Sequence, residues 1–152
     1  MEKIVIQSDI NNIVDVERFV YSVCDTYNIN NYAAIIVVSL LQAVKNAIVH
    51  GNKNDSSKMV NISFDHFRGG VSFTIADECS GFDYQSLLES QSDDEQSNGI
   101  FLMKKLSDNI SFPDNGSKVR LDFIINGIEP SRALERISIL RRHYSLKAVE
   151  SW

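Results

Sequence analysis

A narrow polar stripe runs through the most apolar part of this sequence, from Tyr32 to His50. The stripe consists of Ser39, Gln42, Asn46 and His50. Their spacing of three, four and four residues places them on one face of a helix. One interpretation is that this face is solvated, as the polar face of a core helix ordinarily is. The other is that amides and an imidazole line a ligand site, because solvated stripes are more often Lys and Glu.

Two further stretches carry groups that suit a ligand. In "IADECSGFD", Asp77 ends an expected strand, and its carboxylate can accept a hydrogen bond from an exocyclic amine. Gly81, four residues later, would let a flat ring approach the backbone. In "SNGIFLMKKLSD", Gly99 begins an expected helix whose free N–H groups and positive dipole end suit phosphate. Asn46, on the first stretch, offers a neutral oxygen to a hard cation such as Mg²⁺.

Each of these residues also has an ordinary structural interpretation. Asp77 could cap the turn after its strand, Gly99 could be a turn glycine, and His50 could interact with a helix dipole. The acidic run from Asp93 to Glu95 could bind a metal or belong to a solvated loop. These interpretations weaken together, because the three stretches follow one another in a particular order and spacing.

Hydrophobic periodicity predicts an α+β protein, a two-layer sandwich with helices on one face of a mostly antiparallel sheet. The strands fall in hairpins, and the turns "RGG" and "PDNG" join their members. In chain order we expect a strand at 3–7, helices at 13–27 and 32–50, strands at 60–67 and 71–77, a helix from 99, strands at 109–112 and 118–125, and a helix from 130.

Composition limits the classes of function. The chain has 152 residues with 43% hydrophobic and 23% charged residues, which suits one soluble globular domain. A net charge of −5 argues against direct nucleic-acid binding through bulk charge. Polar residues interrupt the 32–49 run, so we expect no membrane span. The N-terminus does not resemble a signal peptide, and Cys24 and Cys79 lack metal-ligand spacing, so we expect a reducing cytoplasm.

The three stretches together resemble the asparagine box and the two glycine boxes of the GHKL ATPase superfamily, which includes gyrase and the histidine kinases. The matching segments are "QAVKNAIVHG", "ADECSGFD" and "SNGIFLMKKLSD". The short segment before Gly99 and the phrase "GIFLMKKLSDNISF" are similar to the bacterial anti-sigma-factor serine/threonine kinases in particular. The resemblance runs from Ile4 to Ile125, so we divide the chain into a histidine kinase-like ATPase domain, 1–126, and a C-terminal helical extension, 127–152.

The resemblance implies a Bergerat-type fold that binds ATP or ADP with Mg²⁺. It implies that Asp77 meets the adenine amine and that Asn46 ligates the metal. The remaining expected nucleotide-binding residues are Gly81, Phe82, Asn98, Gly99 and Ile100. It also implies a protein partner, either a sigma factor or an antagonist of the STAS fold, and a homodimer.

The sequence departs from the family's pattern at three positions. Gln42 stands where the family has its catalytic acid, and an amide cannot accept a proton at neutral pH. Cys79 replaces the first glycine of the turn after Asp77. Asn98 brings no charge to a position that is often basic in this branch. The segment before it is acidic and would repel a triphosphate unless Mg²⁺, Lys104 or Lys105 compensated its charge.

Three hypotheses remain open. The first is a nucleotide-dependent regulator of a protein partner, with serine-kinase activity weakened or lost at Gln42. The second is an active kinase, because phosphoryl transfer depends heavily on positioning and charge stabilisation. The third is a nucleotide-free interaction module.

The last expected helix has an apolar face and a basic face, and the basic face is either solvated or docks an acidic partner or a second copy. Its apolar residues are Leu134, Ile137, Leu140 and Tyr144, and its basic residues are Arg132, Arg136, Arg141 and Arg142.

Overall fold

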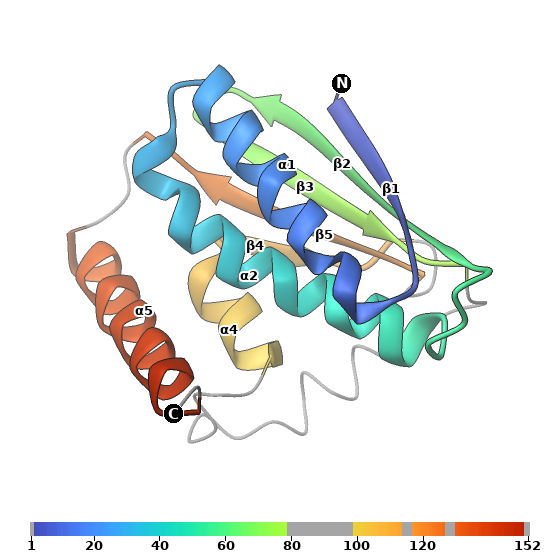
Figure 1. The fold of residues 1–152 in the computed structure, drawn as a ribbon. Coiled ribbons are helices and arrows are strands. Elements are labelled where there is room, and N and C mark those ends of the chain that lie inside the picture. Colours follow the sequence, from blue (N-terminus) through green and yellow to red (C-terminus); the bar gives the residue numbers. More distant parts are fainter. Residues whose placement is uncertain (1, 79–98, 114–116, 127–129, 151–152) are drawn as a thin grey trace.

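The protein is an α+β sandwich in which helices cover one face of a five-stranded sheet (Figure 1). The computed structural model describes residues 2–78, 99–113, 117–126 and 130–150. Figure 1 shows α1 and α2 lying across the sheet, α4 beside α2, and α5 at the side of the molecule. The predicted fold class is confirmed.

The sheet is antiparallel throughout, with the strand order β1-β2-β3-β5-β4. Both predicted hairpins are present, and the chain between β3 and β4 carries α4. Gly69 forms the first hairpin turn with φ +89°, a conformation that favours glycine. The strands are β1 Glu2–Gln7, β2 Met59–Phe67, β3 Gly70–Ala76, β4 Asn109–Ser111 and β5 Lys118–Ile124.

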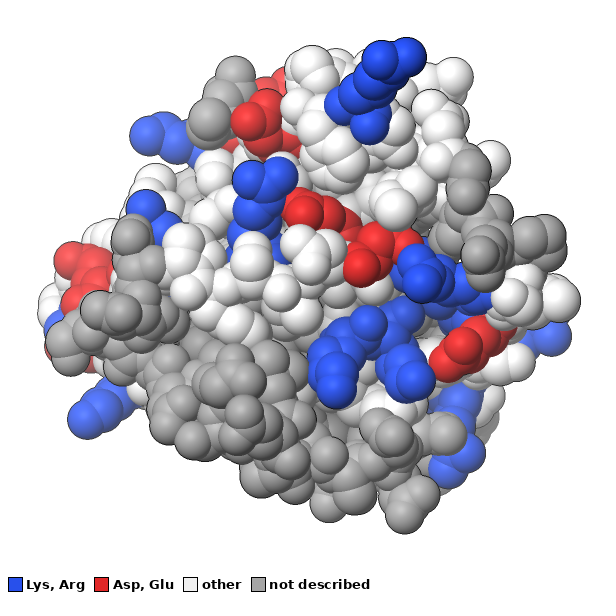
Figure 2. All heavy atoms as spheres, turned by 180° about the vertical axis from the view of Figure 1, so that it is seen from behind, with Lys and Arg blue, Asp and Glu red and all other residues white. Residues whose placement is uncertain are grey.

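Alternation along the strands separates the two faces of the sheet. Large apolar residues point toward the helices and are almost fully buried: Ile62, Phe64, Phe73, Ile75, Leu121 and Phe123. The opposite face is polar, and Figure 2 shows basic and acidic side chains interspersed on it. Arg120 and Asp122 of β5, for example, form an ion pair of 2.8 Å. The sheet therefore buries one face and leaves the other to solvent.

Helix α2 is the centre of the helical layer. It packs against α1, α4 and α5, and it continues into a π-helical turn, η3, that ends at Gly51. Nine of its residues are buried. The helices are α1 Ile13–Thr26, α2 Ala33–Asn46, α4 Gly99–Leu106 and α5 Pro130–Glu150; the short helical turns are η1 Ile10–Asn12, η2 Asn30–Tyr32 and η3 Ala47–Gly51.

The segment Asn30–Gly51 is long and apolar enough to cross a membrane by composition, with a mean hydropathy of 1.8 over its best window. In the fold, 61% of that window is buried. The core helix of a globular domain passes the same test, because it is apolar on nearly every side. The fold itself is like that of a soluble domain.

The C-terminal helix α5 docks through only part of the apolar face that the periodicity predicts. Leu134 is 67% exposed and Ile137 is 43% exposed. The most buried of the described α5 side chains are Arg136 and Ile139, exposed by only 3% and 9%, and Leu140 packs beside Ile139 while partly buried. Ile139 joins Val38 of α2 and three residues of α4, Phe101, Leu102 and Leu106, in a small second core. The reason for this orientation is an acidic partner for Arg136, described below.

Candidate functional site

The site is assembled along the α2–η3 helix, at its middle and at its C-terminal end. Gln42 lies in the middle of α2, and Gly51 ends η3. Each contacts one of the other two predicted boxes. The three stretches, which lie far apart in the sequence, therefore meet along this one helix.

Gln42 lies against the start of α4. A Cβ added to Gly99 would lie 3.0 Å from Gln42 Oε1 and 3.5 Å from Gln42 Cβ. A larger residue at position 99 would therefore press on the amide. The close approach places Gln42 beside the N-terminal turn of α4, the helix that we expect to hold phosphate.

The second contact joins Asp77 to Gly51. A Cβ on Gly51 would overlap the carboxyl group of Asp77, so the two residues pack with no space between them. The backbone N–H of Asp77 donates to the carbonyl of Ser117, at 3.0 Å, which extends the pairing of β3 with β5 by one residue. The sheet and the end of η3 thus fix the acid that we predict to bind adenine.

Sequence reasoning missed Asn52, which organises this end of the site. It is 1% exposed, and its amide nitrogen donates to Ser8 Oγ at 2.8 Å and to the carbonyl of Met59 at 3.0 Å. Its amide oxygen accepts from the backbone N–H of Glu78 at 2.9 Å. One side chain therefore links three segments of the chain: the turn after β1, the start of β2 and the residue just after Asp77. The sequence signal was an asparagine next to the helix-ending glycine.

Solvent exposure increases along the polar stripe from Ser39 to His50. Ser39 is fully buried, and its Oγ has no hydrogen-bond partner among the described residues. Gln42 and Asn46 are half-buried, and His50 is exposed. The stripe therefore does not simply face water, because its first member lies inside the protein and its middle members lie beside other elements.

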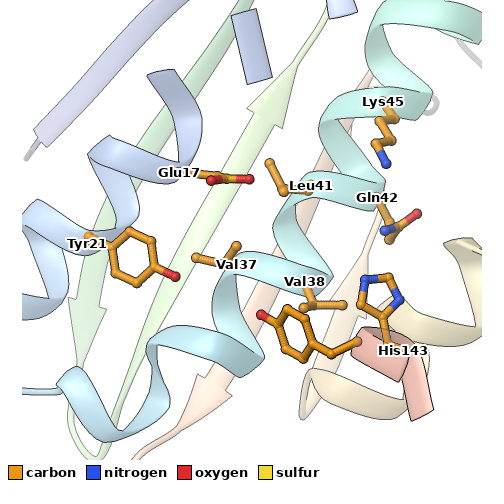
Figure 3. A pocket seen from close by; sticks show the side chains of 9 residues that line it. Glu17, Tyr21, Val37, Val38, Leu41, Gln42, Lys45 and His143 are labelled. Atoms are coloured by element: carbon orange, nitrogen blue, oxygen red, sulfur yellow. The ribbon is translucent and has the colours of Figure 1, made fainter. Parts of the chain in front are cut away.

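A cavity of about 140 Å³ opens on the other side of Gln42, between α1, α2 and α5. Figure 3 shows Glu17 and Tyr21 reaching toward it from α1, and His143 from α5 lying next to Gln42. Its lining combines apolar and polar side chains. The lining residues are Glu17, Tyr21, Val37, Val38, Leu41, Gln42, Lys45, His143 and Tyr144.

The residues predicted near the phosphate end differ in burial and in ion pairing. Ile100 is 4% exposed and belongs to the main core, so only its backbone can face a ligand. Lys105 pairs with Glu135 of α5 at 3.6 Å, whereas Lys104 is exposed. Predictions for another group of residues lie outside the described part of the chain: Cys79, Gly81, Phe82, Asp93, Asp94, Glu95 and Asn98.

The metal prediction rests on Asn46 alone. Within the described residues there is no group of three or more His, Cys, Asp or Glu side chains that could hold a metal ion. A magnesium ion bound through one amide oxygen, phosphates and water needs no such group, because Mg²⁺ usually keeps several waters and takes few protein ligands. Asn46 follows Gln42 by one helical turn, so both face the same side of α2.

Comparison with known families gives a match to the histidine kinase-like ATPase domain over residues 6–123. The match covers most of the chain, and the chain belongs to this family. It ends before α5 begins. Comparison with curated proteins gave no match. The resemblance to the GHKL superfamily is therefore confirmed at the level of the domain, and the ATPase domains of this family typically bind ATP or ADP with Mg²⁺.

Proposed function

We propose that the protein binds ATP or ADP with Mg²⁺ and uses the nucleotide to control binding to a protein partner, in the manner of anti-sigma-factor regulators. The observation that carries the proposal is the pair of close contacts along α2–η3, Gln42 to Gly99 and Asp77 to Gly51. They bring one described residue from each of the other two family boxes against the α2–η3 helix, which supports a single shared site. The protein would act in the cytoplasm, on a sigma factor or a STAS-type antagonist, as a monomer or homodimer.

The residues fit the nucleotide at two points where side chains are excluded. Gly51 has no room for a Cβ beneath Asp77, and Gly99 has little room beside Gln42. Both points leave backbone rather than side chain at the wall of the site. Asp77 would accept from the adenine amine, and the N–H groups after Gly99 would donate to phosphate oxygens.

Asn46 would hold Mg²⁺ through its amide oxygen, and Gly81, Phe82 and Asn98 would complete the nucleotide site by resemblance. Magnesium, when bound, neutralises phosphate charge and orients the terminal phosphate. The protein residues then determine only where the nucleotide sits and what surrounds it.

Gln42 makes phosphoryl transfer slow or absent. It can orient a serine hydroxyl or a water through hydrogen bonds, but it cannot take the proton. Loss of a general base costs about 10²- to 10⁴-fold in rate. Regulation would then depend on nucleotide binding and the conformation it selects, and the serine/threonine kinase activity of the family would be weakened or lost.

Two substitutions test the roles of the site residues. Asp77→Asn should abolish adenine-dependent binding, whereas Asp65→Asn, on an exposed strand position, should leave it unchanged. Asn46→Ala should remove the magnesium dependence of binding, with Asn61→Ala, an exposed residue of β2, as its control. Unchanged nucleotide binding in both site variants would show that Asp77 and Asn46 do not form the site. Absence of nucleotide binding by the natural protein would leave a nucleotide-free interaction module as the better account.

A third substitution tests the neutralised base. Gln42→Glu restores the family's acid, so the rate of phosphate release from ATP should rise by about 10²-fold or more. If this rate does not rise and the natural protein already transfers phosphate, the protein is an active kinase whose rate Gln42 does not limit.

A further inference from the structure

Arg136 of α5 is a buried cation at the C-terminal end of α4. It is 3% exposed, and its guanidinium donates to three acceptors. Nε donates to the carbonyl of Lys105 at 3.2 Å, and Nη2 donates to the carbonyl of Ser107 at 3.2 Å and to Asp108 Oδ1 at 2.8 Å. The planar guanidinium can serve these acceptors together because its donors form a rigid fork.

The acceptors are the groups that the end of a helix leaves unsatisfied. The last carbonyls of an α-helix have no partner within it, and a cation near them is favoured by the helix dipole. Arg136 satisfies two such carbonyls, and Asp108 balances its charge. Asp108 in turn accepts from the backbone N–H of Ile124 at 2.6 Å and from Arg132 at 2.9 Å. The end of α4, β5 and α5 are therefore held together at one carboxylate.

Helix α4 is only eight residues long, so its position is set by what holds its two ends and its apolar side. Its first residue, Gly99, lies against Gln42. Its apolar side packs on Val38 of α2 and Ile139 of α5. Its last turn is fixed by Arg136. Loss of the contacts at one end would leave only the remaining contacts to set the orientation of this short helix.

We infer that Arg136 is a positioning residue for the phosphate end of the nucleotide site. By fixing the C-terminal end of α4, it aligns the N–H groups at the helix's N-terminal end with the phosphates. This role rests on the proposed function, and it comes from a helix outside the family match at residues 6–123. Asp77 and Gly51 at the adenine end are held by the sheet and by η3, so adenine recognition does not depend on Arg136.

Two ligands distinguish the adenine end of the site from the phosphate end. ADP uses both ends, whereas adenosine uses only the adenine end. In the full chain with Mg²⁺, Arg136→Gln should weaken ADP binding by about tenfold, the scale of an anion's interaction with a helix N-terminus in a partly buried site. Adenosine affinity, measured by ligand-observed NMR, should stay within about twofold. Arg142→Gln removes the same charge from an exposed position of α5 and should change neither.

A second variant covers the case in which Arg136→Gln does not fold. Arg136→Lys keeps a cation beside Asp108 but lacks the fork that serves both carbonyls. It should give a smaller loss for ADP and none for adenosine. Hydrogen exchange gives an independent readout: ADP should protect the amides of Phe101 to Met103 in the natural protein and much less so in either variant.

These measurements distinguish failure of the positioning role of Arg136 from failure of the proposed nucleotide binding. Equal losses for ADP and adenosine, or no loss for either, overturn the positioning role while nucleotide binding stands. Failure of the natural protein to bind either ligand overturns the proposed function, and the positioning role with it.

Discussion

Two arginines of α5 bind the same carboxylate, and we predict very different energetic effects from removing them. Arg136 and Asp108 are each 3% exposed in their side chains, whereas Arg132 is 51% exposed. Arg136→Met leaves a buried carboxylate and two helix-end carbonyls without their main donor. Removing one partner of a buried pair costs about 3–5 kcal/mol, and we expect the lower end because Arg132 and the N–H of Ile124 remain.

Arg132→Met is the matched control. It deletes the same charge from the same helix and from the same carboxylate, at 2.9 Å, but from a solvated position. Ion pairs of this kind contribute about 0–1 kcal/mol, because solvent screens them and ordering the side chain costs entropy. We expect a loss of about 0.5 kcal/mol.

Urea unfolding at pH 7, followed by circular dichroism, measures both free energies. Equal m-values would show that the variants unfold over the same extent of structure. The reasoning is refuted if the two substitutions cost the same, or if Arg136→Met costs less than about 1 kcal/mol, the upper range for an exposed pair.

Three further predictions follow from single residues. Burial alone would raise the pKa of Asp108, but hydrogen bonds from Arg136 and Ile124, the charge of Arg136 and the bond from Arg132 outweigh it and lower that pKa below 3.8. Its contribution to stability is therefore complete above the unfolded-state pKa and lost as pH falls from 3.8 through the folded-state pKa, so Asp108→Asn should flatten the loss of stability below about pH 4. Gly51→Ala should push the carboxyl of Asp77 out of place, lowering nucleotide affinity at least tenfold and stability by about 1–3 kcal/mol in calorimetry. Burial raises the pKa of the Cys24 thiol to about 11, so in a Cys79→Ser background thiol reagents at pH 8 should react only on unfolding.

The arrangement of the fold could be predicted because it depends on local signals. Strand alternation and the turns gave the hairpins, and Gly51 and Gly99 marked a helix end and a helix start. The convergence of Gln42 on Gly99 then followed from family resemblance, since no property of either segment alone fixes their distance.

The docking of α5 could not be predicted because it depends on a charge pair from distant parts of the chain. The helix's apolar residues suggested an inward face, yet Leu134 is exposed and Arg136 is buried. A buried arginine is stable only with acceptors, and Asp108 lies 28 residues earlier in the sequence. Asn52 was missed for the same reason, since its three partners lie on separate segments.

Calorimetric titration of the purified protein with ATP and ADP, with and without Mg²⁺, tests the central claim most directly. We predict saturable binding of both nucleotides that Mg²⁺ strengthens, that Asp77→Asn abolishes, and from which Asn46→Ala removes the metal dependence. Absence of binding at millimolar nucleotide by a protein that circular dichroism shows to be folded would contradict the account.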